Sequence, residues 1–292
     1  MNEKNVLITG SNGFVGNELQ LFLEENSCNV FRISLKNNDW KFQSLSKFDV
    51  VIHLAALVHN NTPNAKMVDY MNINYHLTKQ LAEKAKNDGV SQFIFLSTMS
   101  VYGLNGSLTE NVQIDQSTPY KPNTAYGSSK LLAEQAIQLL IDRNYVVNIV
   151  RPPMIFGKGG PGNFAKLIKV AKLNPVFPKI NNERSVIYID NLCIHLLSLM
   201  NNPKAEITHP QNEEFMNTNS ALKLIRKYSG KKIKIIEVPI PKAIKNFFGK
   251  INIFNKIYGN LTYSKNIDGR YMETEFYKSF EESVQNTIKL KK

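Results

Sequence analysis

The segment YGSSK at residues 126–130 places a tyrosine and a lysine four positions apart, within a stretch whose apolar spacing predicts a helix. Residues four apart share one face of a helix, so Tyr126 and Lys130 would point the same way. A free phenol has a pKa of about 10 and is a poor base at neutral pH. A nearby ammonium group favours the phenolate and lowers that pKa. The pair therefore predicts a tyrosine that takes a proton from a hydroxyl group or returns one.

The segment TGSNGFVG at residues 9–16 indicates a phosphate-binding turn. Gly10 would permit a tight turn, Gly13 would let a pyrophosphate reach backbone N–H groups at a helix N-terminus, and Gly16 would let the helix pack on the strand. The segment follows a strand-like run and opens a helical pattern, which is the context that this motif needs. A plain strand-to-helix turn is the structural alternative.

Strand-like and helical segments alternate over the first half of the chain and must position these residues. The strands are expected at residues 5–9, 29–34, 49–56, 92–98 and 145–152, and the helices at 14–25, 67–88 and 124–142. This alternation predicts an α/β fold with a doubly wound parallel Rossmann sheet. After residue 157, glycine, proline and asparagine become frequent and the strand-like segment 185–190 stands alone. We therefore expect a smaller C-terminal substrate lobe.

Together these motifs resemble the extended short-chain dehydrogenase/reductase family, the NAD-dependent epimerases and dehydratases. The spacing Gly-x-x-Gly-x-x-Gly is typical of that family, and the resemblance covers at least residues 5–192. It implies an enzyme that uses NAD(P). It also implies an NAD(P)-binding Rossmann domain at 1–157, to which 183–197 would return, and a substrate-binding lobe at 158–182 and 198–292.

The segment FLSTMSVYG at residues 95–103 resembles the family's strand that delivers a hydroxyl group beside the tyrosine. The match puts Thr98 at the catalytic position, where its hydroxyl would hydrogen-bond the reacting oxygen. Ser97 could instead cap the strand end, Ser100 competes for the role, and a plain strand-end turn is the structural alternative for Thr98. Family 4,6-dehydratases carry Asp-Glu after this threonine, whereas this chain has Met99 and Ser100. A dehydratase is therefore not expected.

Residues after the second expected strand bear on the choice of cofactor. NAD-selective folds often carry an acid there that binds the ribose, but this chain has Arg32 and Lys36 instead. A basic residue can favour the 2′-phosphate of NADP, although Arg32 could equally face solvent. Asp39 and Trp40 fall where the family places an acid and its neighbour against the adenine. We expect NADP if the enzyme is a reductase and NAD if it is an epimerase.

Three further segments match family positions near the cofactor. HLAALVH at residues 53–59 matches a strand end whose small residues let the cofactor pass, NINYHLTKQLA at 72–82 matches a buttressing helix, and RPPMIFG at 151–157 passes the nicotinamide. His53 and His59 read as structural residues, and no metal site is expected. The predicted cofactor-binding residues are Gly10, Asn12, Gly13, Phe14, Val15, Gly16, Arg32, Asp39, Trp40, Leu54, Ala55, Ala56, Asn74, Tyr126, Lys130 and Pro153.

Residues 151–192 resemble those of nucleotide-sugar enzymes. The match places Asn163 on a diphosphate, Phe177 against the nucleotide base and Arg184 on a diphosphate oxygen, with a surface ion pair as the alternative for Arg184. Thr98 would also contact the substrate. The resemblance implies an NAD(P)-dependent oxidoreductase that reduces a UDP-4-keto-6-deoxy-(N-acetyl)hexose at C4 for surface polysaccharide (O-antigen or capsule) biosynthesis. The alternatives are a UDP-hexose 4-epimerase with tightly bound NAD and a non-catalytic NAD(P)-binding regulator, which the intact catalytic residues argue against.

Composition bears on partners and location. The 292 residues are 42% hydrophobic and lack the roughly 20-residue apolar run of a membrane span. Cys28 and Cys193 read as buried free thiols of a cytoplasmic protein. The net charge of +12 comes without a nucleic-acid-binding motif, and the Lys-rich segment 241–261 leaves an interfacial membrane helix as an alternative to an ordinary lobe helix. The resemblance also implies a homodimer through the helices at 67–88 and 124–142.

Overall fold

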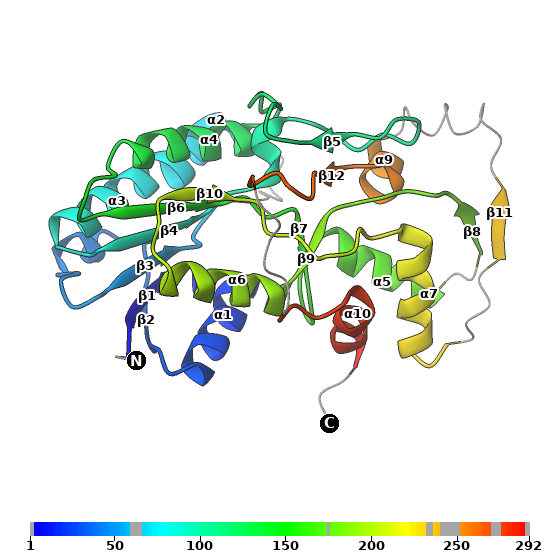
Figure 1. Cartoon of the computed structure of the whole chain (residues 1–292), viewed down its shortest axis with the longest axis horizontal. Helices are drawn as coiled ribbons and strands as arrows, with labels where there is room; N and C mark the ends of the chain where they lie inside the picture. The colour runs from blue at the N-terminus through cyan, green and yellow to red at the C-terminus, as the bar shows by residue number, and fades with distance from the viewer. Residues whose placement is uncertain are drawn as a thin grey trace. The chain divides into compact units, whose positions relative to one another are not determined.

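The structure, a computed structural model, describes residues 3–58, 66–173, 176–231, 236–239, 252–269 and 276–289 (Figure 1). The chain forms two compact units. The first unit comprises 1–103, 119–152 and 193–210, and the second comprises 104–118, 153–192 and 211–292. The units differ from the predicted domains at four segments: 104–118, 153–157 and 183–192 were predicted for the first unit and belong to the second, and 198–210 was predicted for the second and belongs to the first.

The first unit is built on a six-stranded sheet. Its strands are β1 (Asn5–Thr9), β2 (Asn29–Ile33), β3 (Val50–His53), β4 (Gln92–Leu96), β6 (Val146–Val150) and β10 (Glu206–Thr208). They lie in the order β10-β6-β4-β3-β1-β2, and every neighbouring pair is parallel. All four residues of β3 are buried, as expected for a strand covered on both faces. The predicted doubly wound parallel sheet is confirmed.

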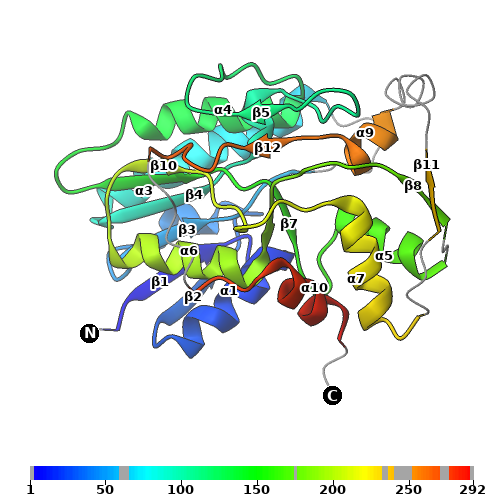
Figure 2. The same cartoon turned by 45° about the vertical axis from the view of Figure 1, so that its right-hand side comes forward.

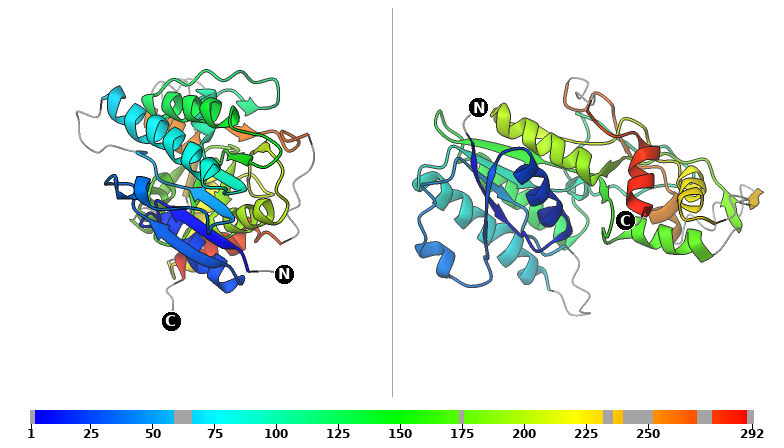
Figure 3. Two further views of the ribbon diagram at one scale, coloured as in Figure 1. Left: turned by 90° about the vertical axis from the view of Figure 1, so that its left-hand side faces the viewer. Right: turned by 90° about the horizontal axis from the view of Figure 1, so that it is seen from below.

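Helices cover both faces of this sheet (Figures 1 and 3). Helix α1 (Phe14–Glu25) lies on one face, and α3 (Leu77–Asn87) and α4 (Ala125–Gln138) lie on the other. The helix predicted at 67–88 is interrupted, because α2 (Met67–Tyr70) and α3 are joined by a π-helical segment, η2 (Met71–His76). Such segments are frequent at functional sites. The buried core beneath α3 and α4 includes Leu7, Val51, Leu81, Phe93, Ala133 and Ile137.

The strand order reverses beside β1. From β1 the chain passes to β2 on one side of it, and then to β3 on the other side. In open α/β sheets, ligands bind outside the carboxyl ends of the strands at such a switch point. Gly10 follows β1 directly and Leu54 follows β3, so the fold brings both predicted cofactor segments to this point.

The described residues of the second unit form three pairs of parallel strands. They are β5 (Gln113–Ile114) with β12 (Thr262–Tyr263), β7 (Met154–Phe156) with β9 (Val186–Tyr188), and β8 (Val176–Lys179) with β11 (Ile236–Pro239). Its helices are α5 (Asn163–Leu173), α7 (Thr218–Tyr228), α9 (Asn252–Tyr258) and α10 (Phe280–Ile288). Helix α7 packs against both α5 and α10 (Figure 2). The ring of Phe156 contacts those of Phe164, Tyr188 and Phe280, and this cluster ties α5 and α10 to the β7–β9 pair.

Several predictions from composition can be compared with the described part of the chain. Within it, no helix is long and apolar enough to cross a membrane, and no group of metal-ligating side chains is present. Cys193 is buried, whereas Cys28 is only half-buried. His59 and most of the Lys-rich segment, residues 241–251, lie outside the described residues.

Candidate active site

The glycine turn between β1 and α1 has no room for a side chain at Gly10 or Gly16. Gly10 has φ of +73°, and a Cβ there would lie 2.5 Å from the backbone nitrogen of Ala55. A Cβ on Gly16 would lie 2.6 Å from the carbonyl oxygen of Gly10, so the first turn of α1 presses directly on the loop. Gly13 occupies the N-cap of α1 and brings no capping side chain to the first-turn N–H groups. This cradle fits a pyrophosphate, which would be held by backbone N–H groups and the helix dipole.

The other predicted residues of this turn surround the cradle. Asn12 is exposed, and Phe14 and Val15 are half-buried. Across the switch point, Leu54 donates its backbone N–H to the carbonyl oxygen of Thr9 over 3.2 Å. Ala55 then faces Gly10, and the small side chain of Ala56 follows it. The structure therefore brings together the predicted residues of both strand ends.

The residues after β2 divide into two groups. Arg32, Lys36 and Asp39 are exposed. Trp40 is 1% exposed and belongs to the hydrophobic core beneath α3 and α4. The ring of Trp40 therefore packs in the core, and a contact of this residue with an adenine stays a prediction. The charged residues of this segment remain available to a ligand.

Helix α4 presents Tyr126 and Lys130 on successive turns, as predicted. The hydroxyl of Thr124 accepts the backbone N–H of Gly127 over 3.0 Å and caps the helix immediately before the pair. The hydroxyl of Thr98 donates to that of Ser100 over 3.2 Å and accepts the backbone N–H of Ser100 as the cap of a 3₁₀ turn. It also lies close enough to the phenol of Tyr126 to lower the pKa of that group. The three predicted catalytic residues thus lie at the end of β4 and on the facing helix.

The electrostatics of the pair differ from the prediction. Burial raises the pKa of Tyr126 to about 12, although the hydrogen bond from Thr98 opposes that rise. The ammonium of Lys130 donates to the carbonyl oxygen of Leu96 over 2.8 Å and lies 4.3 Å from the ring centre of Phe95. Burial lowers the pKa of Lys130 to about 7, and Glu134 partly offsets this. The predicted lowering of the tyrosine pKa is therefore wrong for this state, and the phenol of Tyr126 keeps its proton at neutral pH.

Asn74 holds the helix of the catalytic pair from the π-helical segment. It is fully buried, and its amide nitrogen donates to the hydroxyl of Ser129 and to the carbonyl oxygen of Leu57, each over 3.0 Å. Its amide oxygen accepts the N–H of Leu57 over 2.8 Å. Asn74 therefore links the segment after β3 to α4, which agrees with its predicted buttressing position.

A buried ion pair that the sequence reading missed lies below the catalytic residues. Both oxygens of Glu134 accept from the guanidinium of Arg151, over 3.1 and 2.5 Å, and both side chains are 1% exposed. Glu134 also accepts the hydroxyl of Ser97, the neighbour of Thr98. Arg151 donates in addition to the phenol oxygen of Tyr102 over 2.9 Å. The spacing in the sequence could have predicted the position of Glu134, because it follows Lys130 by four residues and shares its helix face.

Three of the predicted substrate residues, Asn163, Phe177 and Arg184, and the predicted cofactor residue Pro153 belong to the second unit, whereas Thr98 belongs to the first. Pro153 and Phe177 are buried, and Asn163 is half-buried at the first position of α5. Arg184 donates from one terminal nitrogen to the carbonyl oxygens of Asn255 and Gly259, over 3.1 and 2.5 Å. Burial lowers the pKa of Arg184 to about 10. That nitrogen binds carbonyls at the C-terminal end of α9, so only the rest of the guanidinium could reach a diphosphate.

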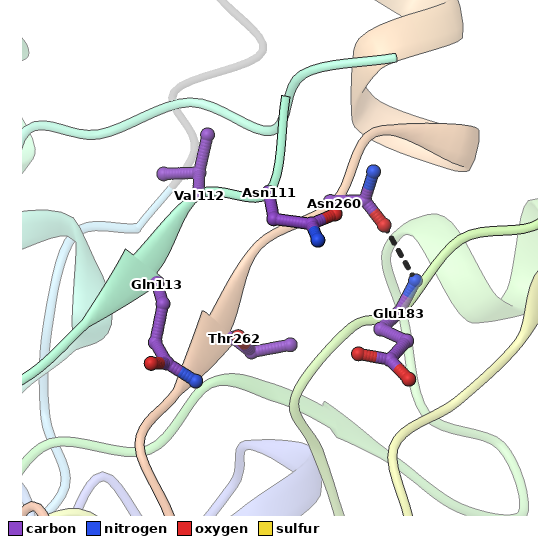
Figure 4. Close-up of a pocket in the computed structure, with 6 residues that line it drawn as sticks. All are labelled: Asn111, Val112, Gln113, Glu183, Asn260 and Thr262. Atoms are coloured by element: carbon purple, nitrogen blue, oxygen red, sulfur yellow. Dashed lines mark hydrogen bonds between the residues drawn. The ribbon is translucent and has the colours of Figure 1, made fainter. Parts of the chain in front are cut away.

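A polar hollow of about 220 Å³ also lies in the second unit, beside β5 and β12 (Figure 4). The amide oxygen of Asn260 accepts the backbone N–H of Glu183 over 2.8 Å at its edge. It contains none of the predicted site residues, and it is lined by Asn111, Val112, Gln113, Glu183, Asn260 and Thr262.

We expect Gly10→Ala to weaken binding of NAD(P) by at least about tenfold, because the new Cβ would push the turn away from Ala55 at the switch point. Titration of the purified protein with NADPH, followed by fluorescence, measures this. Gly89→Ala is the matched control: Gly89 has φ of +87° and open space around its Cβ position. Equal loss in both variants would show that backbone strain, and not the close contact, is responsible.

We expect Lys130→Met to raise the free energy of unfolding at pH 7 by about 2–4 kcal/mol, since each tenfold change in proton affinity corresponds to about 1.4 kcal/mol. The folded-state pKa of Lys130 falls from 10.5 to about 7. Below pH 7 both states hold the proton and the folded state bears the full cost of burial. As pH rises towards 10.5 only the unfolded chain stays protonated, so wild-type stability rises and the advantage of Met shrinks. Urea unfolding at pH 7 and pH 10 tests this, and an advantage that does not shrink would contradict it.

The geometry now defines a class of protein: a Rossmann-type fold with a glycine turn at its switch point, and with Thr98, Tyr126 and Lys130 at the end of β4 and on the facing helix. The sequence model of the NAD dependent epimerase/dehydratase family matches residues 6–212. The chain belongs to this family, as the sequence reading predicted, and it uses a nicotinamide cofactor.

Similar proteins span nearly the whole chain. UDP-glucose 4-epimerase of Vibrio cholerae is 29% identical over 88% of this chain and 86% of its own length. An N-acetyl-α-D-glucosaminyl-diphospho-ditrans,octacis-undecaprenol 4-epimerase of Escherichia coli O157:H7 is 26% identical over 87% of this chain and 81% of its own length. The solved structure of dTDP-4-dehydrorhamnose reductase from Bacillus anthracis with NADP has a TM-score of 0.72 at 19% identity and covers 98% of each chain. The solved structure of UDP-glucuronic acid 4-epimerase from Bacillus cereus with NAD has a TM-score of 0.70 at 19% identity and covers 97% of each chain. The two structures support the fold.

Proposed function

We propose that this protein is an NAD(P)-dependent nucleotide-sugar oxidoreductase that reduces a UDP-4-keto-6-deoxy-(N-acetyl)hexose at C4. The observation that carries the proposal is the position of Tyr126 and Lys130 on successive turns of α4, with Thr98 at the end of β4 beside the phenol. A phenol that keeps its proton at neutral pH can give it to a carbonyl oxygen that gains negative charge as hydride arrives. Ketone reduction needs such a donor at the carbonyl oxygen.

The proposed reaction uses the chain's residues as follows. The cofactor, when bound, supplies hydride to C4 of the sugar. Tyr126 donates its proton to the C4 oxygen, and Thr98 hydrogen-bonds that oxygen and keeps it in line with the phenol. The charge of Lys130 stabilises the phenolate that this transfer leaves. Asn74 keeps the first turns of α4 in place during the transfer.

The proposal assigns contacts with the cofactor and the substrate to charged, polar and aromatic side chains. Exposed Arg32 and Lys36 would favour the 2′-phosphate of NADP over NAD. Asn163 and the remaining donors of Arg184 would hold the diphosphate, and Phe177 would contact the base. We further propose a role in surface polysaccharide biosynthesis, and a homodimer through the faces of α3 and α4.

A UDP-hexose 4-epimerase is the second candidate, and the activities of two relatives favour it. The relatives from Vibrio cholerae and Escherichia coli O157:H7 are both 4-epimerases. An epimerase would use the same Thr98 and Tyr126, but the hydride would return to the opposite face of the ketone, and the cofactor would be NAD that stays bound.

One experiment separates the two candidates. Purified protein is denatured and its released nucleotide identified, and fresh protein is then mixed with NADPH and a UDP-4-keto-6-deoxy-N-acetylhexose. Oxidation of NADPH that depends on the keto sugar supports the reductase. Retained NAD, with interconversion of UDP-hexoses and no net NADPH consumption, would overturn it in favour of the epimerase. Failure of both reactions would reject both.

A further inference from the structure

A continuous series of buried hydrogen bonds runs from the glycine turn to the helix of the catalytic pair. The hydroxyl of Thr9, the residue before Gly10, lies 2.6 Å from Nδ1 of His53. Nε2 of His53 lies 2.8 Å from the hydroxyl of Thr78, which donates to the carbonyl oxygen of Asn74 over 2.8 Å. The side chains of Thr9, His53, Thr78 and Asn74 are all 0% exposed.

The series continues through Asn74 to α4. The amide of Asn74 donates to the hydroxyl of Ser129 over 3.0 Å, and that hydroxyl donates to the carbonyl oxygen of Tyr126 over 2.9 Å. Ser129 is also fully buried. The last acceptor is therefore the backbone of the proposed proton donor itself.

These bonds determine the tautomer of His53. Thr78 has one hydroxyl hydrogen and gives it to the carbonyl oxygen of Asn74, so its oxygen accepts from His53. Nε2 of His53 therefore carries the hydrogen, and Nδ1 accepts from the hydroxyl of Thr9. The ring also stacks on Phe95, with centres 5.7 Å apart and planes 16° apart.

The surroundings keep His53 neutral. Burial lowers its pKa to about 3, and the nearby charge of Lys130 acts in the same direction. The hydroxyl groups of Thr9 and Thr78 face its nitrogens, and the rings of Phe93 and Phe95 flank it. A charged imidazolium would have to donate from both nitrogens, so the hydroxyl of Thr9 could no longer donate to Nδ1.

We propose that His53, as the neutral Nε2–H tautomer, is a positioning residue that ties the glycine turn to Asn74 and thereby fixes Tyr126 relative to the cofactor. The inference rests on the proposed function in one respect: it takes Tyr126 as the proton donor. It extends that function, because the alignment of the Tyr126 phenol would then depend on the end of β1. Strand β1 is separated from β4, the strand that carries Thr98, by β3.

The test combines a spectroscopic and a kinetic measurement on the full chain. In ¹⁵N-detected NMR of histidine-labelled protein, with His53 assigned by its loss in His53→Gln, we expect a fixed Nε2–H tautomer that does not titrate between pH 5 and 8. Thr78→Val, which removes the acceptor, should shift the tautomer ratio. An Nδ1–H tautomer, a titrating His53, or no response to Thr78→Val would overturn the proposal, whatever the enzyme's reaction.

The kinetic measurement separates positioning from stability. We expect His53→Leu and Thr78→Val to lower kcat by about tenfold or more with little change in KM, because misplaced reacting groups slow the chemical step. His53→Gln, whose amide repeats the acceptor and donor, should recover part of the loss. Val51→Ala, on the same strand, is the control for lost core packing. If Val51→Ala lowers kcat as much as His53→Leu does, or if His53→Leu does not lower kcat, the positioning role is rejected. If the wild-type protein is inactive on both types of sugar, the proposed function fails instead. The NMR result alone then decides on the role of His53.

Discussion

Replacing Tyr126 with phenylalanine is expected to lower kcat by about 10²- to 10⁴-fold, the usual contribution of a positioned general acid. The hydroxyl of Thr98, at the end of β4, lies beside this phenol and lowers its pKa. Phenylalanine keeps the ring and its packing on the first turn of α4 but has no proton to give. The fold should therefore survive, and binding of NADPH should change little.

The measurement compares NADPH oxidation and NADPH binding in the variant and the wild type. Tyr145→Phe is the matched control, since the phenol of Tyr145 is buried and donates to the carbonyl oxygen of Ala82 over 2.8 Å, away from the catalytic residues. That variant should lose stability but keep kcat within about twofold. Turnover by Tyr126→Phe at a rate near that of the wild type would show that another group supplies the proton.

Breaking the buried ion pair is expected to have the largest effect on stability. Arg151→Met should lower the free energy of unfolding by about 3–5 kcal/mol, because it leaves the carboxylate of Glu134 buried without its partner. Glu134→Leu should cost a similar amount by leaving the guanidinium unpaired. The double variant should be more stable than either single one, since replacing a buried pair by apolar side chains is often near neutral.

Urea unfolding of the four proteins gives the coupling free energy of the pair. Lys79→Met provides the exposed comparison: Lys79 and Glu83 lie 3.7 Å apart, and their side chains are 45% and 42% exposed. That change should stay below about 1 kcal/mol. A double variant as unstable as the sum of its single variants would mean that Glu134 and Arg151 act on stability independently.

The residues that could be predicted from the sequence are those fixed by local spacing. Gly10 and Gly16 lie in a short turn whose close contacts follow from the strand-to-helix connection. Tyr126 and Lys130 lie four apart on one helix, so their shared face needed no knowledge of the rest of the fold. Thr98 sits at a strand end, where its motif places it.

The errors and omissions concern properties that only three-dimensional packing determines. The burial of the Trp40 ring could not be predicted from its own segment, because the ring packs in a core that α3 and α4 complete later in the chain. The pKa of Tyr126 was expected to fall because a lysine is near it in sequence, whereas desolvation dominates and raises it. Glu134 and Arg151 are 17 residues apart and meet only when β6 packs beneath α4.

The division of the chain into units also has a consequence for its synthesis. The chain crosses between the two units five times, after residues 103, 118, 152, 192 and 210. The edge strand β10 is therefore made only after β7, α5, β8 and β9 of the other unit have been added. Domains generally fold as units while the ribosome adds residues, N-terminal part first. Here the dinucleotide-binding sheet stays incomplete, with β6 as a temporary edge strand, until about two thirds of the protein has been translated.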